Sequence, residues 1–132
     1  MKPRLKYLLD THTLLWAATD EDKLGGKAAR AIATSAFAQL AISDVTLQEI
    51  GLLLHAGRIS FSGSAISVLA PVLDFVTVIP ITLDIAISAP ALSLSHGDQF
   101  DRIITATAKI NRLTLITKDD NITDSEIIPT LW

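Results

Sequence analysis

Short apolar runs alternate along this chain with longer segments of helical character, and this alternation limits the fold more than any other feature. Several of the runs are rich in β-branched residues, which favour strands. Strands that alternate with helices build a parallel sheet covered on both faces, because each parallel connection needs a crossover. The predicted strands are residues 5–10, 40–43, 75–81 and 113–117, with a last short one within 126–131.

Helical segments fill the chain between these strands. The polar stretch 19–27, which contains Gly25 and Gly26, predicts a loop. Pro90 should end or kink the helix that contains it, because proline lacks a backbone N–H and clashes with the preceding turn. The predicted helices are one that carries Leu14, Leu15 and Trp16, followed by 28–40, 43–57, 62–75, 82–92 and 98–111.

The length of 132 residues suits one domain with a substantial core, so we expect residues 1–132 to form one α/β domain. Hydrophobic residues make up 49% of the chain, which indicates a buried interface with a second copy or a partner. No apolar run reaches the roughly 18 residues of a membrane span. The apolar run after the basic start is too short for an export signal, and cysteine is absent, so we expect a cytoplasmic location.

The net charge of −3 argues against a nucleic-acid partner, because nucleic-acid-binding domains are usually basic. The objection weakens if four of the 14 acidic residues surround a metal ion. The remaining 10 acids would then face 11 Lys and Arg residues, a balance of +1.

Four acidic residues fall where the predicted sheet would bring them to one edge. Asp10 ends the first strand, and Asp119 comes two residues after the strand 113–117. Glu49 lies in the first two turns of the helix after the second strand. Asp101 lies in the first turn of the helix before strand 113–117. Because ligands of parallel sheets bind at the carboxyl ends of the strands, we expect these four acids to converge.

A group of carboxylates is unfavourable unless a cation occupies it. Mg²⁺ and Mn²⁺ prefer oxygen ligands and promote phosphodiester hydrolysis without a Ser, Cys or His nucleophile. Each acid alone also has a structural interpretation, and the metal hypothesis depends on the four together. These interpretations are a turn or helix cap for Asp10, a solvated helix face for Glu49, a capping partner of Asp98 for Asp101, and a turn for Asp119.

Five segments carry recognisable motifs in a fixed order over nearly the whole chain. They read LLDTHTLLW at 8–16, ISDVTLQEI at 42–50, HGDQFDRII at 96–104, LTLITKD at 113–119 and IPTLW at 128–132. Together they resemble the PIN-domain family, in its branch of VapC-like toxins. Gln99 stands where the matching helix start of that branch has proline.

This resemblance implies a PIN-like three-layer fold with a central, mostly parallel sheet of about five short strands. It implies a metal-dependent endoribonuclease that uses Mg²⁺ or Mn²⁺, cuts RNA and forms a homodimer. It also implies the toxin of a toxin–antitoxin pair, inhibited by a small cognate antitoxin that we expect on helices within 28–58.

The resemblance also assigns residues to the site. Its acidic site corresponds to Asp10, Glu49, Asp101 and Asp119, with supporting hydroxyls at Thr11 and Thr117. Asp98 matches the first acid of the helix start, as a helix cap or a supporting group. Arg102 would orient a carboxylate, contact phosphate or pair with Asp98 four residues back.

Two alternative functions remain open. The first is a binding module that keeps the fold without turnover. The second is a phosphotransfer domain, which is disfavoured because His12 stands where a second acid should follow Asp10 by two residues. His12, His55 and His96 are too scattered to predict a zinc site. Trp16 and Trp132 are predicted to be core or interface residues rather than base-stacking surfaces.

Overall fold

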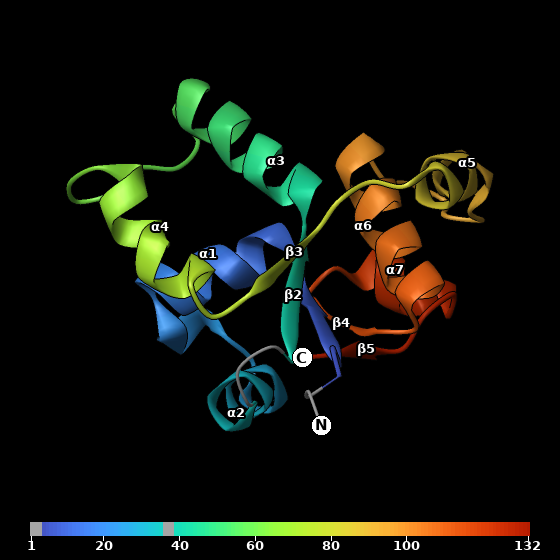
Figure 1. The fold of residues 1–132 in the computed structure, drawn as a ribbon, viewed down its shortest axis with the longest axis horizontal. Helices are drawn as coiled ribbons and strands as arrows, with labels where there is room; N and C mark the ends of the chain where they lie inside the picture. Colours follow the sequence, from blue (N-terminus) through green and yellow to red (C-terminus); the bar gives the residue numbers. More distant parts are fainter. Residues whose placement is uncertain (1–3, 36–38) are drawn as a thin grey trace.

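The computed structural model describes residues 4–35 and 39–132. Within these residues five strands form one sheet in the order β3-β2-β1-β4-β5 (Figure 1). All neighbouring strands pair in parallel, which confirms the predicted α/β fold and makes its sheet entirely rather than mostly parallel. The strands are β1 (Tyr7–Leu9), β2 (Leu40–Ser43), β3 (Thr77–Ile79), β4 (Thr114–Ile116) and β5 (Thr130–Leu131).

Helices cover both faces of this sheet, with α1, α2 and α4 on one side and α5, α6 and α7 on the other (Figure 1). Helix α3 continues from the carboxyl end of β2. No helix in the described part of the chain is both long enough and apolar enough to cross a membrane. The helices are α1 (Thr11–Thr19), a 3-10 turn η1 (Glu21–Lys23), α2 (Gly26–Thr34), α3 (Asp44–His55), α4 (Ala65–Leu73), α5 (Leu83–Ala91), α6 (Gln99–Asn111) and α7 (Asp120–Ser125).

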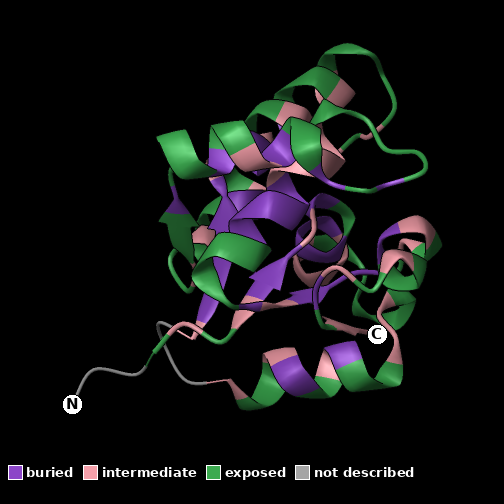
Figure 2. Cartoon of the chain, turned by 90° about the vertical axis from the view of Figure 1, so that its right-hand side faces the viewer, coloured by how far each residue is buried: buried purple, intermediate pink, exposed green. Residues whose placement is uncertain are grey.

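The core has two halves, one on each face of the sheet. Because successive side chains of a strand point to opposite faces, neighbours on one strand enter different halves. Leu8 and Leu115 pack into the half under α5 and α6, whereas Leu9 and Ile116 pack into the half under α1 and α2. Figure 2 shows the buried residues gathered on the strands and on the inward faces of the helices.

Helix α2 begins earlier than the sequence predicted, inside the expected loop, and it ends at Thr34 rather than at 40. Residues 36–38 of the predicted helix lie outside the described residues. The early start has a physical reason, because the first N–H groups of a helix need partners from outside it. The backbone N–H groups of Lys27 and Ala28 both donate to the Trp132 carbonyl oxygen at 3.1 Å.

Helix α7 was missed by the sequence analysis. It has six residues, of which only Ile122 is buried, so it shows no apolar periodicity. Its start is set by Asp119, whose Oδ1 accepts a hydrogen bond from the backbone N–H of Ile122 at 3.1 Å. By contrast, Pro90 acts as predicted, since it lies in the last turn of α5 and the helix ends at Ala91.

Candidate functional site

The structure brings the four predicted acids to one cavity of about 530 Å³ at the carboxyl edge of the sheet. Asp10 directly follows β1, and Asp119 stands between β4 and α7. Glu49 projects from α3, and Asp101 from the first turn of α6. Four separate segments therefore contribute one carboxylate each.

Asp10 is held in place from two sides. Its Oδ1 accepts a hydrogen bond from the backbone N–H of Thr11 at 2.7 Å, and its Oδ2 accepts one from the Thr117 hydroxyl at 2.6 Å. The Thr117 oxygen accepts in turn from the backbone N–H of Asp119 at 3.0 Å. Thr117 is buried, so one hydroxyl fixes the positions of two of the four acids.

Thr117→Val should lower the free energy of unfolding by about 1–3 kcal/mol, because Asp10 loses a donor and the Asp119 N–H loses its acceptor. Urea denaturation without divalent metal measures this. Thr105→Val is a matched control, since Thr105 is also buried but its hydroxyl has no hydrogen-bond partner among the residues that the structure describes. We expect little change there. An equal loss at both positions would mean that the Thr117 hydroxyl does not support the site.

Thr11 follows Asp10 and supports Glu49. Its hydroxyl lies 3.1 Å from that of Thr46, and its interaction with the Glu49 side chain lowers the pKa of that carboxyl, partly opposing burial. Thr46 is fully buried and lies one turn before Glu49 on α3. Thr46 was not among the predicted site residues, although its spacing from the acid was the available signal. The two threonines connect α1 to α3 where the acids meet.

Asp98 and Asp101 have different surroundings although they are three residues apart. Asp98 is the N-cap of α6, and its Oδ1 accepts from the Asp101 backbone N–H at 2.9 Å. The predicted capping interaction is therefore present in one direction. Among the described residues, no hydrogen bond is formed to the Asp101 carboxylate, which leaves it available to the cavity.

Arg102 has a different role from those that the sequence suggested. Its guanidinium does not pair with Asp98 four residues back. It donates to the carbonyl oxygens of Leu92 at 3.0 Å and Leu94 at 3.2 Å, with a longer contact to Ala89 at 3.5 Å. Carbonyls at a helix end lack partners within the helix, which explains this contact. Arg102 thus ties the end of α5 to the start of α6.

Burial and mutual repulsion make the acidic cavity electrostatically unfavourable in the absence of a cation. Burial raises the pKa of Asp10, although the hydrogen bonds from Thr117 and Thr11 partly oppose it. Burial likewise raises the pKa of Glu49. The pKa of Asp101 rises to about 7, first through burial and then through repulsion by neighbouring carboxylates, led by Asp98. In the described part of the chain, too little positive charge lies near these three carboxyl groups to offset their burial and repulsion.

The donor set fits a hard divalent cation, because it offers only carboxylate oxygens with unbalanced negative charge. In the described ranges, no three His, Asp or Glu side chains are close enough to hold an ion by themselves. Mg²⁺ usually keeps several waters and binds proteins through one or two carboxylates. A cavity of about 530 Å³ has room for those waters, so these residues fit a hydrated ion.

Four further residues line this cavity and were not predicted as site residues: His12, Thr13, Trp16 and Lys118. Trp16, which was predicted to be a core or interface residue, is half-buried. Its ring centroid lies 5.8 Å from that of His12 and 5.7 Å from that of Trp132. The Lys118 Nζ lies 5.9 Å from the Trp16 ring centroid. Lys118 could have been found from its place between Thr117 and Asp119.

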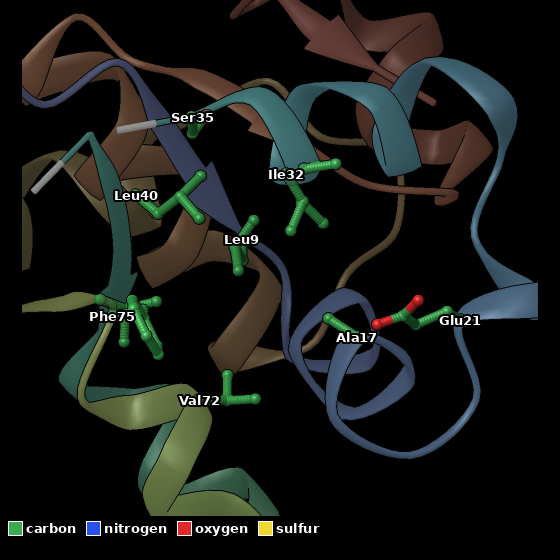
Figure 3. A pocket seen from close by; sticks show the side chains of 10 residues that line it. Leu9, Ala17, Glu21, Ile32, Ser35, Leu40, Val72 and Phe75 are labelled. Carbon is green, nitrogen blue, oxygen red and sulfur yellow. The ribbon is translucent and has the colours of Figure 1, made fainter. Parts of the chain in front are cut away.

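A second cavity of about 350 Å³ lies on the face of the sheet that α1, α2 and α4 cover (Figure 3). Its lining is mainly apolar and includes Leu9, Ile32, Leu40 and Val72, with Glu21 as the single carboxylate among the lining residues. It offers no group of charged side chains for chemistry. The acidic cavity is therefore the candidate active site.

Comparison with known proteins agrees with this geometry. The model of the PIN domain family matches residues 7–126. Ribonuclease VapC22 of Mycobacterium tuberculosis is 33% identical over 113 residues, which cover 85% of each chain. A toxin-antitoxin complex from Klebsiella pneumoniae contains a chain with a TM-score of 0.66 and 27% identity, matching 96% of this chain and 97% of that one. VapBC2 from Rickettsia felis, bound to promoter DNA, gives a TM-score of 0.71 at 18% identity, over 96% and 98% of the chains.

Proposed function

This chain belongs to the PIN-domain family, and from that premise we propose that it is a metal-dependent endoribonuclease, the toxin of a toxin–antitoxin pair. The observation that carries the proposal is the meeting of four carboxylates in one cavity at the carboxyl edge of the sheet. Similarity to a ribonuclease over most of both chains supports RNA as the substrate. A cytoplasmic location suits that substrate.

We assign Asp10, Glu49, Asp101 and Asp119 to the binding of Mg²⁺ or Mn²⁺. When bound, the ion supplies Lewis-acid stabilisation of the phosphodiester group and makes a nearby water more acidic. Thr117 holds Asp10 and the backbone of Asp119, and Thr11 holds Glu49. This preorganisation matters because second-shell hydrogen bonds fix the orientation of carboxylate ligands.

Asp98 and Lys118 complete the proposed site without belonging to the acidic set. Asp98 fixes the start of α6, and so the position of Asp101. Lys118 is exposed and lines the same cavity, where its ammonium group can bind a phosphate oxygen of the substrate. It is thus a positive group beside four negative ones.

We place the cognate antitoxin on an apolar groove between α3 and α4. Helix α3 lies within the range 28–58 where the antitoxin was expected, and α4 lies beyond it. Leu47, Ile50 and Leu54 line the groove from α3, and Ile66 and Leu69 from α4. Ile66 is 82% exposed, and exposed apolar patches mark protein interfaces. Because α3 also carries Glu49, a partner on this groove would lie close to the acidic cavity.

Exposed apolar side chains near the edge strand support a homodimer. They are Val78 on β3, Ile81 after that strand, and Leu83 and Ile87 on α5. Leu83 is 74% and Ile87 64% exposed. Symmetric dimers are the commonest soluble oligomers and bury such self-complementary patches.

The proposal is tested by incubating the purified protein with a mixture of structured RNAs in Mg²⁺ or Mn²⁺, with EDTA as the control. We expect discrete cleavage products with metal and none in EDTA, seen on a denaturing gel. A folded protein that binds Mn²⁺ but cleaves nothing would favour the alternative of a binding module. A protein that neither cleaves RNA nor binds metal would overturn the nuclease assignment.

A further inference from the structure

A smaller cavity of about 230 Å³ adjoins the acidic one and shares part of its wall. His12 and Trp16 line both cavities. They lie four residues apart on α1, so both side chains project from the same face of that helix. The smaller cavity continues away from the acids to Lys23 in η1 and to Arg58 and Phe61 after α3. A ligand that follows this wall passes directly from one cavity to the other.

The two cavities differ in charge. The acidic cavity is lined by five carboxylates and Lys118, whereas the lining of the smaller cavity contains Lys23 and Arg58 and no carboxylate. Lys23 and Arg58 are both exposed, and in the described residues neither side chain forms a hydrogen bond or an ion pair. Their charges are therefore available to a ligand. Lys118 over the Trp16 ring places a further cation where the cavities meet.

A polyanion that must approach the acids needs such a neighbouring surface, because carboxylates repel phosphates until a metal ion intervenes. Phosphate contacts from Lys and Arg supply most of the affinity of nucleic-acid complexes and fix their register. An aromatic side chain between phosphate-binding cations is the usual arrangement for single-stranded nucleic acid. A cavity of about 230 Å³ has room for one unstacked base, and single strands present their bases in that form.

We propose that this basic cavity binds the nucleotide next to the scissile phosphate in single-stranded RNA, with Lys23 and Arg58 holding the backbone phosphates. His12 and Trp16 form the shared wall along which the strand turns into the acidic cavity. The inference rests on the proposed ribonuclease function. It adds which residues hold the RNA beside the acids and from which side of the acids the RNA enters.

The test measures binding of a short labelled single-stranded RNA by fluorescence anisotropy in EDTA, where the RNA stays intact. The double variant Lys23→Ala, Arg58→Ala should bind about tenfold more weakly or worse, because charge-assisted hydrogen bonds are among the stronger contacts. Loss of two phosphate contacts should also reduce the slope of log K against log salt by about 1.4, at roughly 0.7 for each contact on a single strand.

The matched control is Arg30→Ala, Lys109→Ala, which removes the same charge from exposed helix positions outside both cavities. We expect its affinity and salt slope to stay close to those of the unmodified protein. An equal loss of RNA affinity in both double variants would mean that only the net charge matters, and it would overturn the proposed site. Duplex RNA that binds as tightly as the single strand, with the same loss in the Lys23 and Arg58 variant, would overturn the single-strand assignment.

Failure of the subsite and failure of the ribonuclease function give different results. A protein that cleaves RNA with Mg²⁺, yet shows no dependence of RNA binding on Lys23 and Arg58, would remain a ribonuclease without this subsite. A protein that neither binds nor cleaves RNA would remove both the proposed function and the inference built on it.

Discussion

Asp101→Asn should reduce the rate of RNA cleavage by roughly 10²–10³-fold or more, the range seen when one preorganised electrostatic group is lost from an active site. The Asp101 carboxylate lies in the acidic cavity and forms no hydrogen bond with the described part of the chain. Asparagine keeps its shape and removes its charge, so the expected loss reflects metal binding rather than folding. Initial rates in Mg²⁺, with circular dichroism to confirm folding, measure it.

Asp98→Asn is the matched control for that result. Asp98 lines the same cavity, but its Oδ1 caps α6 through the Asp101 backbone N–H at 2.9 Å. Asparagine is as good a helix N-cap as aspartate, so the start of α6 should keep its position. We expect a loss of less than about tenfold, below the 10- to 100-fold range of a disrupted supporting contact. Similar losses in both variants would contradict the distinct roles of these two acids.

The sequence was sufficient to predict that the four acids converge because they follow a rule of topology. Asp10 and Asp119 come after strands of a parallel sheet, and Asp101 lies in the first turn of a helix that runs back along the sheet. Such positions meet at one edge whatever the details of packing. The prediction that the Thr117 hydroxyl supports the site depended on the family resemblance. Its hydrogen bond to Asp10 joins residues 107 positions apart in the sequence, so no local pattern indicates it.

Other features depend on tertiary packing and left no local signal. Arg102 and Asp98 have the spacing of a helical ion pair, but Arg102 instead meets carbonyl oxygens at the end of α5. Lys23 and Arg58 are far apart in sequence and share a cavity only because η1 and the segment after α3 both lie against α1. In the sequence Trp16 looks like an ordinary apolar residue of a helix, and only the structure shows that it lines both cavities.

The same Asp101→Asn substitution should stabilise the metal-free protein at pH 8, by about 1–2 kcal/mol. The full rise in the pKa of Asp101 from 3.8 to about 7 would correspond to ~4 kcal/mol, at about 1.36 kcal/mol per unit. Solvent screening of this partly exposed carboxyl reduces that figure. Urea denaturation of both proteins in EDTA measures the difference.

The sign of this effect follows from proton linkage. Because the folded-state pKa lies above the unfolded value, the folded protein binds more protons between about pH 4 and pH 7, and its stability falls as the pH rises through that window. The difference between Asp101→Asn and the unmodified protein should therefore be small at pH 4 and largest above pH 7. A difference that does not change with pH would contradict the raised pKa.

Added Mg²⁺ should reverse the order of stability. A ligand that binds only the folded state stabilises it by RT ln(1 + [L]/Kd), and the unmodified protein has the charge that lowers the Kd for the ion. Asp101→Asn should gain much less from Mg²⁺, so the variant that is more stable in EDTA loses its advantage as the metal is titrated. Such a crossing would identify the repulsion among these acids as the cost of holding a cation. Parallel gains in both proteins would place the bound metal away from Asp101.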